Sequence, residues 1–168
     1  MSTGPIAGNL RLLGQGLSLL GLIPDELYQA TPGRSSVGAQ YRHILDHYLC
    51  LLDDLPSGSI DYDARRRDPQ VDADPRVAAR LTDDLLRRLD DLMEMDLDRP
   101  LQVHLAPTAD SADGVHYGST VGRELLFLIS HTVHHFAIIR LQLEEAAMSF
   151  DAEFGVAPST LAFHGAAS

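Results

Sequence analysis

The chain of 168 residues contains no lysine, because all 13 of its basic residues are arginine. This absence excludes Schiff-base chemistry on lysine, a lysine general base and the lysine of a phosphate-binding loop. Cysteine is nearly absent as well. Cys50 is the only one, so the chain can form neither an internal disulfide nor a metal site of several thiolates. Positive charge is scarce against 24 acidic residues, and the net charge of −11 disfavours binding to nucleic acid.

Long hydrophobic runs are also missing. The longest uncharged segments, Leu12–Pro24 and Leu125–Ile139, fall short of the ~18 apolar residues that a membrane span needs, and the second contains three histidines. No small-x-small cleavage site follows the apolar stretch near the N-terminus. We therefore expect no signal peptide, no membrane association and a cytoplasmic protein. The sequence also lacks a Gly-x-Ser-x-Gly motif, a phosphate-binding loop and a dinucleotide fingerprint.

What remains is the composition of an ordinary globular domain, with 45% hydrophobic and 22% charged residues. The length predicts a single domain over residues 1–168. Apolar residues recur at helical spacing through most of the chain, which predicts an all-α fold. We expect four long helices, at about residues 5–30, 36–55, 74–95 and 120–147, and an irregular tail from Glu153. One long crossover between them makes a four-helix bundle the predicted architecture.

Shorter signals mark the ends of these helices. Pro24 can kink or split the first helix. The N-caps expected for the other three are Ser35 or Ser36, then Asp74 followed by Pro75, then Ser119 or Thr120. Residues 57–72 are typical of a long polar loop. Residues 101–105 alternate between apolar and polar side chains, which is compatible with a short strand or an extended segment.

Histidine is the unusual resource, with eight residues. On a wheel of the fourth helix, His135 lies about 20° from the buried Leu128 and His131 about 60°, whereas His134 lies about 120° away. Two imidazoles four residues apart on one face can reach one metal ion. The alternative is one hydrogen-bonded core histidine and one half-exposed histidine. Burying two imidazoles without a purpose costs free energy, which favours the metal.

A third ligand is expected from the second helix, where polar side chains line the edge of the apolar face. They are Ser36, Gln40, His43, His47 and Cys50. His43 and His47 are again four residues apart, and the helical wheel leaves both open, with His47 slightly nearer the apolar face. The neighbours that do not bind the metal would orient the ligands. Cys50 is read as a small core residue.

The segment His43-Ile44-Leu45-Asp46, followed by His131-Thr132-Val133-His134-His135 on the last long helix, resembles the DinB/YfiT-like superfamily. Its members are four-helix bundles in which three histidines hold a divalent metal. One histidine comes from a His-apolar-small-Asp pattern on the second helix, and two come from a His-x-x-x-His on the last helix. The resemblance implies His43, His131 and His135 as the ligands of Zn²⁺ or Ni²⁺.

Two departures from the family pattern concern the substrate pocket more than the metal. Leu45 replaces a small residue, and Phe136-Ala137-Ile138 stands where many members have a more polar run. The resemblance also implies a function, because better-understood members are transferases or isomerases that use low-molecular-weight thiols such as bacillithiol or mycothiol.

Three neutral nitrogen ligands leave an open coordination position, as in catalytic sites. A water bound there can become a nucleophile, and a thiol can bind as thiolate. We expect a metal-dependent transferase or hydrolase with a small-molecule substrate, acting as a homodimer. Asp46 and His47 are candidates for orienting the ligands or shuttling protons, and Glu124 is a helix-start charge or a channel-lining acid.

Three alternatives remain open at this point. The protein can be a non-catalytic bundle whose histidine cluster is structural or metal-sensing and whose function lies in dimerisation. The histidines can also bind nothing and form a polar core network. The run Arg65-Arg66-Arg67 is most simply a solvated turn, with contact to an anion or a substrate carboxylate as the alternative.

Overall fold

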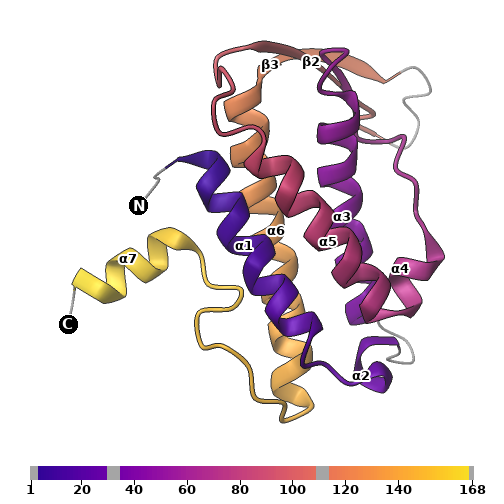
Figure 1. The fold of residues 1–168 in the computed structure, drawn as a ribbon, viewed down its shortest axis with the longest axis vertical. Coiled ribbons are helices and arrows are strands. Elements are labelled where there is room, and N and C mark those ends of the chain that lie inside the picture. The colour runs from indigo at the N-terminus through magenta and orange to yellow at the C-terminus, as the bar shows by residue number, and fades with distance from the viewer. Residues whose placement is uncertain (1–3, 30–34, 109–113, 167–168) are drawn as a thin grey trace.

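Four long helices form the body of the protein in the computed structural model, which describes residues 4–29, 35–108 and 114–166. They are α1 (Pro5–Leu20), α3 (Val37–Asp54), α5 (Pro75–Asp90) and α6 (Val121–Glu145). Both α1 and α3 pack against α5 and against α6, so the apolar faces of all four meet in one core (Figure 1). The fold is mostly helical, as the sequence predicts.

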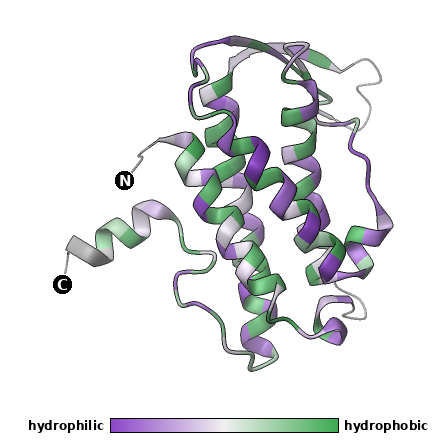
Figure 2. Ribbon diagram, in the orientation of Figure 1, coloured by the Kyte–Doolittle hydropathy of each residue, from purple (hydrophilic) through white to green (hydrophobic). Residues whose placement is uncertain are grey.

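The apolar face expected for α3 is buried along its whole length. Its members are Val37, Tyr41, Ile44, Leu45, Tyr48, Leu51, Leu52 and Leu55. Ser36 caps the helix, because its hydroxyl accepts the backbone N–H of Ala39 at 2.9 Å. Bands of hydrophobic and hydrophilic residues alternate along α5 (Figure 2), which buries Ala78, Leu85 and Leu89. None of the helices in the described ranges has the length and hydrophobicity needed to cross a membrane.

The expectation of an all-α fold is wrong in one respect, because a small sheet lies across one end of the helices (Figure 1). Its strands are β1 (Ser59–Asp61), β2 (Pro100–Leu105) and β3 (Val115–Thr120), in the order β1-β2-β3. β1 runs parallel to β2, and β3 runs antiparallel to it. β2 is the alternating segment that the sequence singled out. β3 is mostly exposed, so no apolar alternation marked it.

The sequence also misplaced several helix boundaries. The first expected helix, 5–30, is two helices, because α1 ends at Leu20 and α2 (Asp25–Gln29) begins after Pro24, whose ring cannot continue a helix. The expected loop 57–72 contains β1 and α4 (Pro69–Ala73), which starts at a proline capped by Asp68. The tail expected to be irregular contains α7 (Pro158–Ala166), whose Phe163 is exposed. A helix without a buried face leaves little periodic signal.

A buried polar network fixes the relative positions of α1, α3 and α6. The Tyr48 hydroxyl on α3 donates to Asn9 Oδ1 on α1 at 2.7 Å, and it lies 3.1 Å from the Thr132 hydroxyl on α6. Asn9 Nδ2 donates in turn to the carbonyl of Leu125 at 2.9 Å. Because buried polar groups need defined partners, this network sets the register in which α3 and α6 face each other. β1 follows the end of α3 and β3 leads directly into α6, so the two helices run antiparallel from the sheet.

Candidate metal centre

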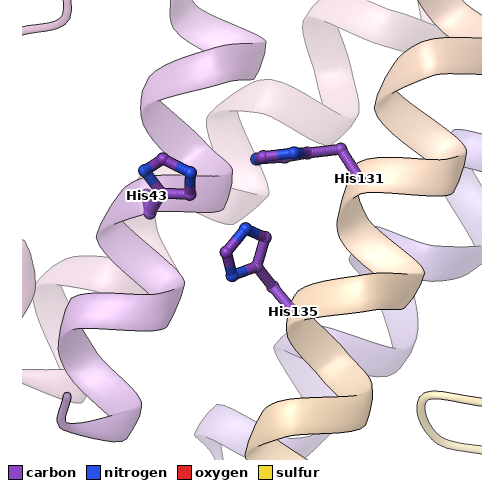
Figure 3. A group of neighbouring side chains, drawn as sticks. All are labelled: His43, His131 and His135. Carbon is purple, nitrogen blue, oxygen red and sulfur yellow. The ribbon is translucent and has the colours of Figure 1, made fainter. Parts of the chain in front are cut away.

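Three histidine side chains converge between α3 and α6. His43 comes from α3, and His131 and His135 lie one turn apart on α6; their rings are turned toward a common space (Figure 3). One ring nitrogen of each lies within 4.8 Å of the others. The ring centroids are 5.0 Å apart for His43 and His131, 4.6 Å for His43 and His135, and 4.5 Å for His131 and His135. We call these three residues the histidine triad.

The triad is neutral at neutral pH. Burial lowers the pKa of His43 to about 4 and that of His135 to about 4, and the neighbouring imidazoles act in the same direction. Burial, together with the facing histidines, lowers the pKa of His131 to about 2. A neutral imidazole has one nitrogen with a free lone pair, which is the form that binds a metal. The triad therefore offers three uncharged nitrogen donors.

His131 carries an unsatisfied atom. Its Nε2 is buried and has no hydrogen-bond partner among the described residues. Leaving a buried polar atom without a partner costs about 1–3 kcal/mol. His131 also extends from α6 toward the space between the three rings (Figure 3). A cation coordinated by the triad is a partner that suits this nitrogen, so the residues present fit a metal.

Gln40 fixes the protonation of His135. The Gln40 side-chain oxygen lies 2.5 Å from His135 Nδ1, and an amide oxygen only accepts hydrogen bonds. Nδ1 is therefore the protonated nitrogen, and Nε2 keeps its lone pair. Histidines that bind metals in proteins usually donate their other N–H in this way. Gln40 also lines a hollow of about 340 Å³ beside the triad, with Ser35, Ile138, Leu141, Gln142 and Glu145.

The structure groups His43, and not His47, with the two histidines of α6. His47 has both ring nitrogens engaged: Nδ1 donates to the carbonyl of His43 at 2.7 Å, and Nε2 accepts from Arg65 Nη1 at 3.3 Å. Its ring nevertheless packs 4.1 Å from that of His131, centroid to centroid. His47 thus lies against the triad and contacts the backbone of one of its members.

Asp46 is turned away from the triad toward arginines. Its buried carboxylate lies 3.4 Å from Arg42 Nη1, one turn earlier on the same helix. Burial raises the pKa of Asp46, and the arginines oppose that shift. The ion-pair partner of Asp46 therefore lies within α3 and outside the histidine triad. The proposed roles of Asp46 and His47 in proton transfer stay predictions.

Tyr62 is a site residue that the sequence did not indicate, because it lies in a segment without periodicity. Its buried ring stacks on His47 with centroids 5.6 Å apart. Its hydroxyl donates to Glu124 Oε2 at 2.9 Å. Glu124 has no exposed surface and also accepts hydrogen bonds from Ser119 and Arg123. Glu124 is thus connected to the triad through Tyr62 and His47.

A second group of possible metal ligands lies near β1 and β2, and hydrogen bonds within the fold account for the closeness of its side chains. Atoms of Asp61, Asp63 and His104 lie within 4.8 Å of one another. Asp61 Oδ1 accepts the backbone N–H groups of Asp63 and Ala64, and Asp63 Oδ2 accepts that of Ala106. These hydrogen bonds hold the turn after β1 against the end of β2.

Other predicted features have simple outcomes. His134 is exposed, as the helical wheel indicates. Cys50 is a buried core residue, and burial raises the pKa of its thiol to about 11, so it is no ready nucleophile.

A comparison with known families matches the model of the DinB superfamily to residues 15–139, a range that contains all three triad histidines. The chain belongs to the DinB superfamily. Membership in the DinB superfamily, which the motifs on α3 and α6 suggest, is thereby confirmed. A DinB-like protein from Bacillus subtilis, YjoA, has a similar fold: the TM-score is 0.64 at 18% sequence identity, and the match covers 89% of this chain and 96% of that one.

A second similar protein is much longer. FK506-binding protein 5 of Rhizopus delemar is 33% identical over 113 residues, which are 64% of this chain and 29% of that protein. The DinB superfamily chain thus spans less than a third of this relative's length.

Proposed function

We propose that this DinB superfamily protein is a four-helix bundle with a long crossover that binds one divalent transition metal, Zn²⁺ or Ni²⁺, through His43, His131 and His135. The observation that carries the proposal is the presence of three neutral ring nitrogens within 4.8 Å of one another on two helices. The unsatisfied Nε2 of His131 and the hydrogen bond from His135 to Gln40 support it. DinB-like proteins are often metal-binding, which adds a family argument.

We further propose that the site is catalytic, in a transferase that uses a low-molecular-weight thiol or in a hydrolase. A divalent ion held by the triad supplies a Lewis acid that lowers the pKa of a thiol or of water. The residues of the chain supply the rest. Gln40 holds the proton on Nδ1 of His135, and the packing of His47 and Tyr62 excludes water from one side of the triad.

The metal content of protein prepared without an affinity tag tests the first step. We expect about one transition-metal ion per chain in elemental analysis, since three neutral imidazoles suit Zn²⁺ and Ni²⁺. His43→Ala, His131→Ala and His135→Ala should lose it. His134→Ala is the matched control, because His134 is exposed on the same helix and should keep the metal.

Two results would contradict the proposal. Absence of transition metal from the wild-type protein, even after incubation with Zn²⁺ or Ni²⁺, would leave the histidines as a polar network. A metal that exchanges no ligand with added thiol or water would make the site structural. The electronic spectrum of the Co²⁺-substituted protein distinguishes these cases, because it changes when a small molecule coordinates at an open position.

The proposed assembly is a homodimer. Several large apolar side chains are exposed on the surface, among them Leu22, Leu126 and Leu141. Sedimentation equilibrium of the purified chain, whose monomer mass is 18.3 kDa, decides between monomer and dimer.

A further inference from the structure

We propose that Arg65 is an anion-binding residue beside the histidine triad, and that the small molecule bound there carries a carboxylate group next to its reacting atom. The first part of this proposal, anion binding, concerns Arg65 alone. The second part, the carboxylate next to the reacting atom, rests on the proposed function, since it assumes that the substrate reaches the metal.

Arg65 differs from the other arginines that the structure describes. Most of them contact a carboxylate or a backbone carbonyl: Arg11, Arg42, Arg66, Arg76, Arg87, Arg88, Arg99, Arg123 and Arg140. Arg67 and Arg80 are exposed to water. Arg65 is half-buried, and its hydrogen bond goes to the neutral ring nitrogen of His47. In a chain of net charge −11, a guanidinium directed at an uncharged imidazole is an exception.

The loop holds Arg65 in this position from both sides. Tyr62, three residues before it, is buried and bonded to Glu124. On the other side, Asp68 caps α4, because its carboxylate accepts the backbone N–H of Gln70 at 2.9 Å, and α4 packs against α3. The backbone on both sides of Arg65 is therefore anchored, and its side chain is placed over His47 by the structure of the loop.

No described carboxylate forms an ion pair with Arg65, although the buried carboxylate of Asp46 acts on it electrostatically from a greater distance. Arg42 also lies near His43, but it faces Asp46 at 3.4 Å and Asp72 at 3.3 Å. The carboxylate of Asp63 is near His47, but among the described residues it forms no ion pair with Arg65, and its Oδ2 accepts the backbone N–H of Ala106. A divalent cation bound by the histidine triad would add two positive charges beside Arg65, so an anionic ligand would complement this site.

A guanidinium recognises a carboxylate particularly well. It presents N–H donors in a planar fork that matches the two carboxylate oxygens. One donor, Nη1, is used by His47, and the rest of the fork has no hydrogen-bond partner among the described residues. A phosphate offers the same oxyanion chemistry, and the experiment below separates the two.

The test compares two thiols that differ in charge, 3-mercaptopropionate and 3-mercaptopropanol, bound to the Co²⁺-loaded protein. The thiolate-to-cobalt absorption band gives the Kd of each. We expect wild type to prefer the acid and Arg65→Gln to reduce that preference about tenfold, the size of one charge-assisted hydrogen bond in a half-exposed site. The intrinsic acidity of each thiol is the same in both proteins and cancels. Arg65→Lys should keep part of the preference.

Arg66→Gln is the matched control. It removes the same charge one residue away, from an exposed side chain paired with Asp53, and should leave the preference for the acid unchanged. An equal preference in wild type and Arg65→Gln would overturn the inference. An equal loss in Arg66→Gln would also overturn it, because the effect would then come from net charge.

A second measurement does not depend on thiol binding. The Arg65 Nε–H resonance, assigned by its loss in Arg65→Gln, is followed in the zinc-loaded protein during titration with propionate, propionamide and inorganic phosphate. We expect propionate to shift the signal and propionamide to leave it unchanged. A shift with phosphate alone would overturn the assignment to a carboxylate, and no shift with either anion would overturn anion binding. If neither thiol produces a band while propionate shifts the signal, the proposed thiol-dependent transferase fails and the role of Arg65 stands.

Discussion

Gln40 on α3 accepts a hydrogen bond from Nδ1 of His135 on α6, at 2.5 Å between the heavy atoms. The contact joins two helices whose sequences are far apart, and it decides which nitrogen of His135 keeps a lone pair. The same residue lines the hollow beside the triad. Gln40 thus contacts one proposed ligand and also lines a surface hollow.

Replacing Gln40 should weaken metal binding and leave the fold intact. In Gln40→Ala, His135 loses the partner that fixes its tautomer, and we expect the affinity for Zn²⁺ to fall about 10- to 100-fold. Gln142→Ala is the control, since Gln142 lines the same hollow but donates to the carbonyl of Ser35. Competition with a chromophoric chelator measures both affinities. Equal affinities in the two variants would contradict an orienting role for Gln40.

His131 should show opposite effects on metal binding and on stability. His131→Leu removes a buried nitrogen that has no partner among the described residues. We therefore expect the metal-free variant to be more stable than metal-free wild type by about 1 kcal/mol, while metal binding is lost. Urea unfolding in the presence of a chelator gives the stability. A variant that is less stable than wild type would show that His131 contributes to the fold itself.

The metal-free protein should lose stability as the pH falls below 6.5. In the unfolded chain, histidines protonate near pH 6.5. In the folded protein, burial lowers the pKa of His43, His47 and His135 to about 4 and that of His131 to about 2. The unfolded state then binds more protons, so stability is fully present above pH 6.5 and falls as the pH drops toward 4.

The midpoint of urea unfolding, measured between pH 7.5 and 5, tests this window. Most carboxylates contribute little there, because their ordinary pKa values lie near 4. Asp46, whose pKa is raised by burial, is present in every variant compared. His131→Leu removes one of the four histidines and should show a shallower fall than wild type, whereas His134→Ala should match wild type. Identical slopes in His131→Leu and wild type would mean that the pKa of His131 is the same in the folded and unfolded states.

Glu124 should be a strong determinant of stability. Its buried carboxylate accepts from Tyr62, Ser119 and Arg123, so Glu124→Ala leaves several donors without a partner. We expect the free energy of unfolding to fall by about 1–3 kcal/mol, mainly because the buried Tyr62 hydroxyl loses its hydrogen-bond partner. Glu144→Gln, which breaks an exposed pair with Arg140, should change it by less than about 1 kcal/mol. Chemical denaturation compares the two, and similar losses would contradict a central role for Glu124.

The sequence predicted those features that depend on local periodicity. The apolar face of α3 and the buried stripe of α6 follow from helical spacing, and Ser36 and Asp74 cap the helices as expected. The sequence pattern gave no prediction for elements whose side chains are mostly exposed. β3 exposes most of its side chains, and α7 has no buried face among its described side chains, so neither produced a periodic signal.

The candidate site was predictable only in part, for a geometric reason. His43 and His47 are one helical turn apart and about 40° apart around the axis, so a wheel cannot separate them. What separates them is tertiary structure, because Arg65 and the carbonyl of His43 occupy the nitrogens of His47. The contact of Tyr62 with Glu124 likewise joins residues from a loop and a helix, and no spacing rule relates them.

The convergence of His43 with His131 has a consequence for the unfolded chain. About 90 residues separate the two in sequence, so an ion bound to both would close a long loop, as a covalent cross-link does. An ion that stays bound to the denatured chain would restrict the chain's conformational freedom. An ion that is released on denaturation would lose its ligands on both α3 and α6. The metal would then act as a reversible cross-link between α3 and α6, formed only when the ion is available.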